Sequence, residues 1–144
     1  MSDMTPTVIF LPGISGMQLP ENIEKVGYPD TATDLEKILK LHGLNVDYAV
    51  TKSERVEVAH RAIDIWLPII GFAAGAAGNV ALNILSNALY DRFINRRRND
   101  LPTPTIHLRL VRLPDGTEVF ELNGGPEEIV ETIREIGKGD RDDV

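Results

Sequence analysis

The sequence has no cysteine, an excess of acidic over basic residues and no recognisable export signal. Without cysteine, disulfide bonds and thiolate metal sites are excluded. The net charge of −7 argues against general nucleic-acid binding, which needs a basic surface, so we expect no nucleic-acid partner. The first ten residues, MSDMTPTVIF, lack the basic region and long apolar core of a secretory signal. We therefore expect a cytoplasmic protein.

Signatures of catalysis are also missing. Residues 10–16, FLPGISG, resemble the strand and glycine turn near the oxyanion hole of lipases, but no G-x-S-x-G nucleophile elbow follows. Ser15 would need a histidine brought close by the tertiary fold, and a strand-ending loop is the favoured interpretation. His42, His60 and His107 do not have metal-ligand spacing, and no glycine-rich phosphate loop is present. We predict no catalytic residue, no metal and no cofactor, and we expect a protein that is not an enzyme.

Length and composition indicate a folded chain. Its 144 residues suit one domain, and 42% hydrophobic with 26% charged residues is ordinary for a globular protein. We expect a single domain over residues 1–144. Within it, residues 7–50 form a strand–helix–strand part, 53–99 a central helical region, 105–137 a hairpin with a helix, and 138–144 a flexible tail.

Residues 65–90 form the longest apolar run, with no charged residue in 26 positions. We read it as a long helix rich in glycine and alanine. Small and amide residues recur in it at every fourth position, which places them on one face of a helix. That stripe, predicted to be an interface, comprises Gly71, Gly75, Asn79, Asn83 and Asn87. Trp66 and Phe72 flank Pro68 and are interpreted as core, with an aromatic belt at a membrane interface as the alternative.

The same run allows a membrane interpretation. A helix over residues 65–90 is long enough to cross a bilayer, and residues 71–75 (GFAAG) match a small-xxx-small helix contact. The basic flank that follows would then hold the C-terminal side in the cytoplasm. This flank comprises Arg92, Arg96, Arg97 and Arg98. Three asparagines and Pro68 lower the hydrophobicity, so a buried helix is favoured and membrane association stays the alternative.

Before this run, the pattern predicts a βα unit. Residues 7–11 are β-branched and aromatic and read as a buried strand. Residues 30–42 form an amphipathic helix that ends at Gly43, and residues 44–50 alternate apolar and polar side chains as a strand does. Ser53 is predicted to cap a further helix containing Val56, Ala59, His60 and Ile63.

After it, residues 106–113 and 118–122 flank the turn sequence PDGT and predict a β-hairpin. A three-residue loop that begins at Asp115 would set Leu110 opposite Leu122. Pro126 then begins an amphipathic helix, whose buried face is predicted to comprise Ile129, Val130, Ile133 and Ile136. The fold class is therefore α+β. A small mixed sheet, made of the βα unit and the hairpin, packs with the long apolar helix and the C-terminal amphipathic helix.

The order from residue 63 onward carries a resemblance. An apolar small-residue helix (GFAAGAAGNVALNILSNAL), an arginine cluster (RFINRRR) and the hairpin with its acidic helix (IHLRLVRLPDGTEVFELNGGPEEIVETIREI) follow one another. This resembles the effector-associated constant components of prokaryotic conflict systems. The resemblance implies a non-catalytic accessory that couples to NTPase, protease or other effector partners. We therefore expect an adaptor that assembles with itself or with a protein partner, and a membrane-inserted component is the alternative.

Overall fold

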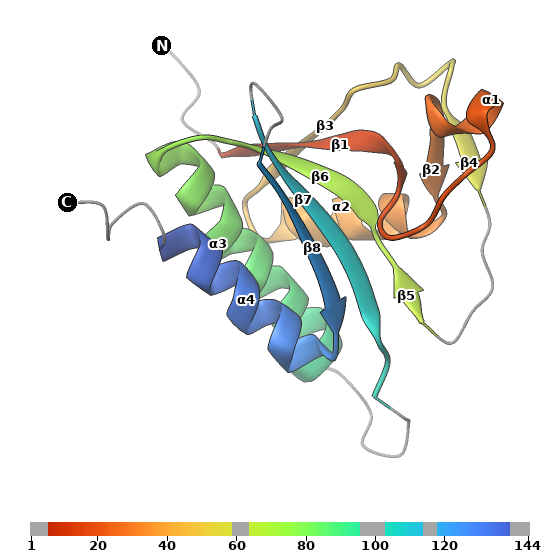
Figure 1. Cartoon of the computed structure of the whole chain (residues 1–144). Coiled ribbons are helices and arrows are strands. Elements are labelled where there is room, and N and C mark those ends of the chain that lie inside the picture. Colours follow the sequence, from red (N-terminus) through yellow and green to blue (C-terminus); the bar gives the residue numbers. More distant parts are fainter. Residues whose placement is uncertain (1–5, 59–63, 96–102, 114–117, 139–144) are drawn as a thin grey trace, which may run out of the picture.

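The computed structural model describes residues 6–58, 64–95, 103–113 and 118–138, and these form an α+β fold (Figure 1). The strands are β1 (Thr7–Ile14), β2 (Gly27–Pro29), β3 (Asn45–Tyr48), β4 (Val56–Val58), β5 (Ile65–Trp66), β6 (Pro68–Ala73), β7 (Ile106–Leu113) and β8 (Glu118–Gly124). The helices are α1 (Glu21–Glu24), α2 (Thr31–Leu41), α3 (Ala76–Tyr90) and α4 (Pro126–Lys138), and a π-helical turn, η1 (Asp91–Asn95), extends α3. The predicted fold class is confirmed.

The main sheet is mixed. Its strands follow the order β3-β1-β6-β7-β8, and β5 pairs with β7 just ahead of β6. Strand β1 is parallel to β3, and β6 is parallel to β7, whereas the β1–β6 and β7–β8 pairs are antiparallel. The predicted strand–helix–strand unit is therefore present with parallel strands. Helix α3 supplies a second crossover, from β6 to β7. Strands β2 and β4 form a separate parallel pair.

All three long helices lie on one face of the main sheet. Alternate strand residues share a single core with the inner faces of α2, α3 and α4. From the strands, this core takes Val8, Phe10, Val46, Ile70, Phe72, Ile106, Leu108, Leu110 and Leu122. Figure 1 shows α3 and α4 side by side against that face. The predicted buried face of α4 is confirmed for Ile129, Val130 and Ile133, while Ile136 is half-buried.

The prediction of one helix over residues 65–90 is wrong. The first part forms β5 and β6, and α3 begins only at Ala76, after Gly75 turns the chain with a φ of +84°. Strand β6 lies between β1 and β7, and its residues Pro68 to Phe72 are buried, which explains why it carries no charged residue. A run without charged residues is compatible with a central buried strand as well as with a buried helix. No helix in the described ranges is long and apolar enough to cross a membrane.

The hairpin is confirmed, but its register differs from the prediction by two residues. Leu110 lies opposite Phe120, and Leu122 lies opposite Leu108. A shift of two keeps every side chain on its predicted face, so apolar patterning does not separate the two registers. Cross-strand charge does separate them, because the observed register sets Arg112 opposite Glu118 and Arg109 opposite Glu121. The loop itself lies outside the described residues.

The helix predicted after Ser53 is also corrected. Val56 belongs to β4, which pairs with β2. The backbone of β2 provides hydrogen-bond partners that the local amphipathic pattern of residues 53–63 does not reveal. The other residues named for that helix, Ala59, His60 and Ile63, lie outside the described ranges. Thr31 is the first residue of α2, and its hydroxyl donates to the Trp66 carbonyl oxygen at 2.7 Å. Gly43 ends that helix as predicted, with a φ of +90°.

Candidate interaction surface on the open face of the sheet

The face of the sheet opposite the helices carries apolar side chains in cross-strand rows. The central row runs from Ile9 through Gly71 and Val111 to Val119, with each residue directly opposite the next. Ile9 and Val111 are half-buried, and Val119 is 47% exposed. Asp47 is paired with Ile9 and ends the row at the β3 edge. In the described part of the chain, no helix covers this row.

Two further pairs extend the apolar surface on either side of the central row. Leu11 lies opposite Ile69, and Ala73 lies opposite Leu113. Leu113 leans over Gly71, because a Cβ added at that glycine would lie 2.8 Å from the Leu113 Cδ1 atom. Gly71 thus has a packing role in a strand. We refer to Ile9, Leu11, Ile69, Gly71, Ala73, Val111, Leu113 and Val119 as the open face. Ile69 and Gly71 are buried beneath their neighbours, so the accessible surface comes from the other six residues.

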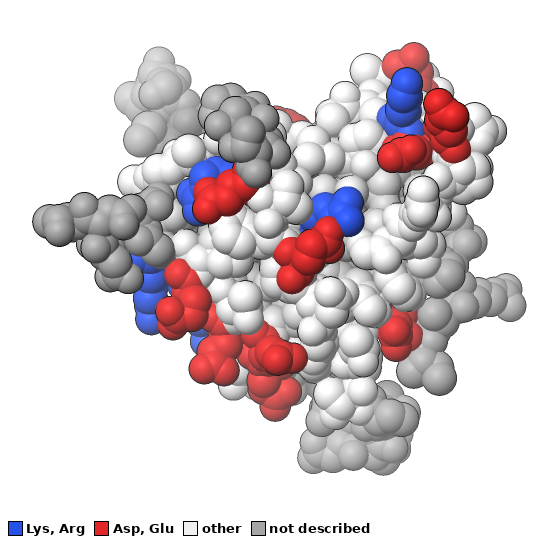
Figure 2. Space-filling view, in the orientation of Figure 1, with Lys and Arg blue, Asp and Glu red and all other residues white. Residues whose placement is uncertain are grey.

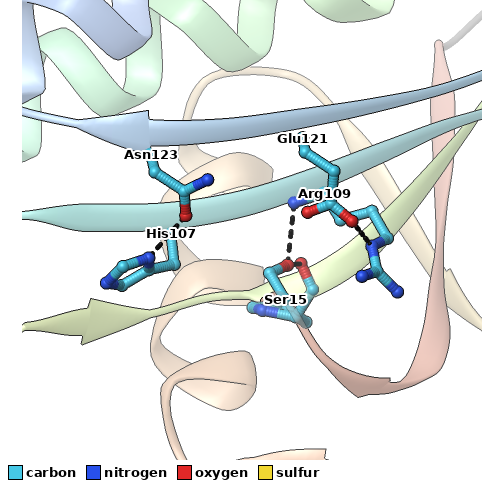
Figure 3. A network of polar contacts seen from close by, with 6 residues as sticks. Ser15, His107, Arg109, Glu121 and Asn123 are labelled. Carbon is cyan, nitrogen blue, oxygen red and sulfur yellow. Dashed lines mark hydrogen bonds and ion pairs between the residues drawn. The ribbon is translucent and has the colours of Figure 1, made fainter. Parts of the chain in front are cut away.

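A polar network borders the open face (Figure 3). The His107 ring lies between two oxygen atoms, with Nε2 at 2.9 Å from Asp64 Oδ2 and Nδ1 at 2.5 Å from Asn123 Oδ1. The Trp66 ring stacks on it, with centroids 3.8 Å apart and planes 12° from parallel. Both ring nitrogens are therefore engaged within the protein.

Ser15 belongs to the same region but has a structural role. Its side chain is fully buried, and its hydroxyl donates to the Pro68 carbonyl at 3.1 Å. The same oxygen accepts a hydrogen bond from the Arg109 backbone N–H at 2.8 Å. The hydroxyl thus joins the end of β1 to β6 and β7. A buried oxygen with both functions satisfied is not an accessible nucleophile. The interpretation of residues 10–16 as a strand-ending loop is wrong for residues 10–14, which belong to β1.

Arg109 and Glu121 form an ion pair across β7 and β8 at the edge of the open face. Their side chains are 35% and 44% exposed, so water screens the pair and its contribution to stability is small. The pair borders a depression of about 690 Å³ that also touches Trp66, His107 and Gln18. Two carboxylates, Glu24 and Glu121, and one cation, Arg109, line it. Within the described ranges, no three acidic or histidine side chains cluster closely enough to hold a metal ion.

A second depression, of about 460 Å³, lies between α2, β3 and the small sheet. Tyr48 donates a hydrogen bond to Glu36 Oε1 at 2.9 Å, and the Arg55 guanidinium lies 3.7 Å from the Tyr48 ring centroid. Burial, and then the bond to Glu36, raises the pKa of Tyr48. Burial alone would raise the pKa of Glu36, but hydrogen bonds from Lys40 and Tyr48 outweigh it and lower that pKa. Because the carboxylate already accepts these two bonds, we assign this cluster a structural role, which is to hold α2 against β3.

The residues predicted to form one helical stripe lie in three different settings. Gly71 is in a strand, and Gly75 precedes α3, so neither can belong to a helix stripe. Asn87 accepts a hydrogen bond from Arg134 of α4 at 3.3 Å, and the Asn83 side-chain oxygen would lie 3.6 Å from a Cβ at Gly137. The Asn79 Oδ1 atom is buried and has no hydrogen-bond partner among the described residues. The amide side of α3 therefore faces α4 of the same chain.

The basic flank is only partly described. Arg92 lies 3.6 Å from Asp34 of α2, so it joins η1 to that helix. Arg96, Arg97 and Arg98 lie outside the described ranges. Trp66 and Phe72, which flank Pro68, are placed differently from one another, since Phe72 is 1% exposed in the core and Trp66 stacks on His107 outside it.

Sequence reasoning missed the open face and the His107 network. Asp64 and Asn123 are 43 and 16 positions from His107, and only the pairing of β7 with β5 and β8 brings them together. His107 and Arg109 are two positions apart in β7, so they share a face of the sheet. Comparisons of the chain with protein-family models, curated proteins and solved structures found no match.

Proposed function

We propose that this chain is a non-catalytic interaction component that binds a protein partner through the open face. The observation that carries the proposal is the row from Ile9 to Val119, which is apolar from β1 to β8 and has no helix over it. Contiguous exposed apolar surface on a folded domain usually marks a binding site. Three helices cover the opposite face of the same sheet and bury it in the core. The open face has no such cover, which distinguishes it from a face used only for packing.

The polar groups beside the open face favour binding over catalysis. The His107 nitrogens and the Ser15 hydroxyl are all engaged in hydrogen bonds that join strands. An acid–base or nucleophilic role requires a group that can reach a substrate. These residues instead fix the relative positions of β1, β5, β7 and β8. A rigid frame under an apolar surface suits recognition of a partner, because little ordering is needed when the partner binds.

An adaptor role in a prokaryotic conflict system remains part of this proposal. The resemblance of the C-terminal half to effector-associated constant components supports it. The membrane alternative was based on one helix over residues 65–90, whereas residues 65–66 and 68–73 are strand and α3 has 15 residues. The interface proposed at the sequence level on the asparagines is replaced by the open face.

The test compares two valines of equal exposure on different surfaces. Val119 lies on the open face and is 47% exposed, and Val80 lies on α3 and is 48% exposed. The tagged full-length chain and its Val119→Lys and Val80→Lys variants are expressed in the native host. The mass of each recovered assembly is then measured by light scattering.

We expect Val119→Lys to reduce recovery of the native assembly at least tenfold, because a charge must be desolvated at the contact. Val80→Lys should recover it as the unaltered chain does. Equal recovery with both variants, or a wild-type chain recovered only as a free 15.9 kDa species, would refute the proposal.

A further inference from the structure

We infer that the partner of the open face is a second copy of this chain, packed sheet against sheet. This inference rests on the proposed function and specifies the occupant of the same surface. In the central row and the two pairs beside it, the surface is apolar except for Asp47 at one edge, and the adjoining Arg109–Glu121 pair carries one charge of each sign.

The acidic character of the chain is concentrated elsewhere. Figure 2 shows acidic side chains gathered over α4 and again over α1, while the surface between them is largely uncharged and its charged side chains lie as adjacent pairs of opposite sign. On α4 the exposed carboxylates are Glu127, Glu128, Glu131 and Glu135. The net charge of −7 would repel a second copy that approached α4. The open face is where two copies can meet with little repulsion.

This distribution favours a second copy over a charged partner. A basic protein would gain most from the α4 carboxylates and little from a nearly neutral apolar face. An interface between identical copies must be self-complementary, because a two-fold axis sets the same patch against itself. An apolar patch bordered by one cation and one anion meets this condition. Each Arg109 has a carboxylate available within its own chain and needs none from the partner.

The size of the patch sets the expected affinity. Adjacent strands are about 4.8 Å apart, and side chains on one face recur about every 6.8 Å along a strand. The patch therefore measures roughly 20 Å by 20 Å, which places the total buried surface on the order of 1,000 Å². This is the lower end for specific interfaces. We expect a reversible dimer that dissociates in the micromolar range.

The first measurement is sedimentation velocity of the purified full-length chain from low micromolar to sub-millimolar concentration. The wild type should change from 15.9 kDa to twice that mass. Val119→Lys should remain monomeric throughout, and Val80→Lys should dimerise as the wild type does. High salt should not dissociate the dimer, because the contact is mainly apolar. Thermal unfolding establishes that each variant is folded.

A second measurement leaves the charge of the surface unchanged. The absence of native cysteine allows single-cysteine variants. Val111→Cys lies in the central row, and Val80→Cys on α3 is the control. A short bis-maleimide should cross-link Val111→Cys into dimers at least tenfold more efficiently than Val80→Cys. Equal cross-linking of the two variants would overturn the inference.

The outcomes separate this inference from the proposed function. A wild-type chain that stays monomeric at every concentration removes the second copy as the occupant. If Val119→Lys still loses the assembly recovered from the host, the open face binds a different protein and the proposed function stands. If neither experiment responds to Val119→Lys, both are wrong.

Discussion

Replacing Gly78 with alanine tests how closely α3 packs on the end of β6. Gly78 is the third residue of α3 and is buried. A Cβ at this position would lie 1.6 Å from the Ala73 carbonyl oxygen and 2.7 Å from its carbon. Both are backbone atoms, so no change of rotamer can relieve the collision. Helix α3 would have to move away from the strand that leads into it.

Two opposing terms set the size of the effect. Alanine is favoured over glycine within a helix by about 1 kcal/mol. Overpacking a well-packed site costs about 1–3 kcal/mol and occasionally more. Because the obstacle here is backbone, we expect the cost to exceed the upper value and the net loss of unfolding free energy to be about 2–3 kcal/mol. For a chain of this length, that loss lowers Tm by about 6–10 °C.

The matched control is Gly137→Ala in α4. Gly137 is also helical and buried, but the nearest atoms to its added Cβ lie 3.6 Å away, an ordinary van der Waals distance. This variant should be unchanged or more stable by up to about 1 kcal/mol. Urea unfolding followed through Trp66, the only tryptophan, measures both variants. A Gly78→Ala protein as stable as the wild type would show that α3 does not pack this closely on the end of β6.

Two further substitutions test the buried polar contacts. Ser15→Ala removes the acceptor for the Arg109 N–H and the donor to the Pro68 carbonyl, so unfolding free energy measured in urea should fall by about 1–3 kcal/mol, and an unchanged midpoint would contradict this role. Because the folded-state pKa of Glu36 is lowered, its contribution to stability is present above the unfolded-state pKa and is lost as pH falls through the folded-state pKa. In urea titrations, Glu36→Gln should therefore lose less unfolding free energy than the wild type between neutral and acidic pH. Parallel pH profiles for the two proteins would show that Glu36 does not contribute this pH-dependent stability.

The elements that sequence patterning predicted best are those whose signals are local. Helix α2 and its glycine end follow from an amphipathic repeat and a residue that accepts a positive φ. Helix α4 follows from Pro126 and the spacing of its isoleucines. The prediction of one long helix over residues 65–90 was wrong because a buried strand and a buried helix can have the same apolar composition. The predicted hairpin register was wrong because cross-strand pairing of arginines with glutamates, and not apolar patterning, distinguishes the two registers.

The sequence by itself determined the α+β class and the absence of disulfide chemistry, because alternation, helical spacing and cysteine content are properties of the chain alone. Only the tertiary structure decided which face of the sheet the helices cover. That choice depends on crossovers from β1 to β3 and from β6 to β7, which place α2 and α3 on the same side. Residues distant in sequence, such as Ile9 and Val119, become one surface only when four strands pair in register. Long-range pairing of this kind leaves no periodic signal in the chain, so the candidate site emerged only from the fold.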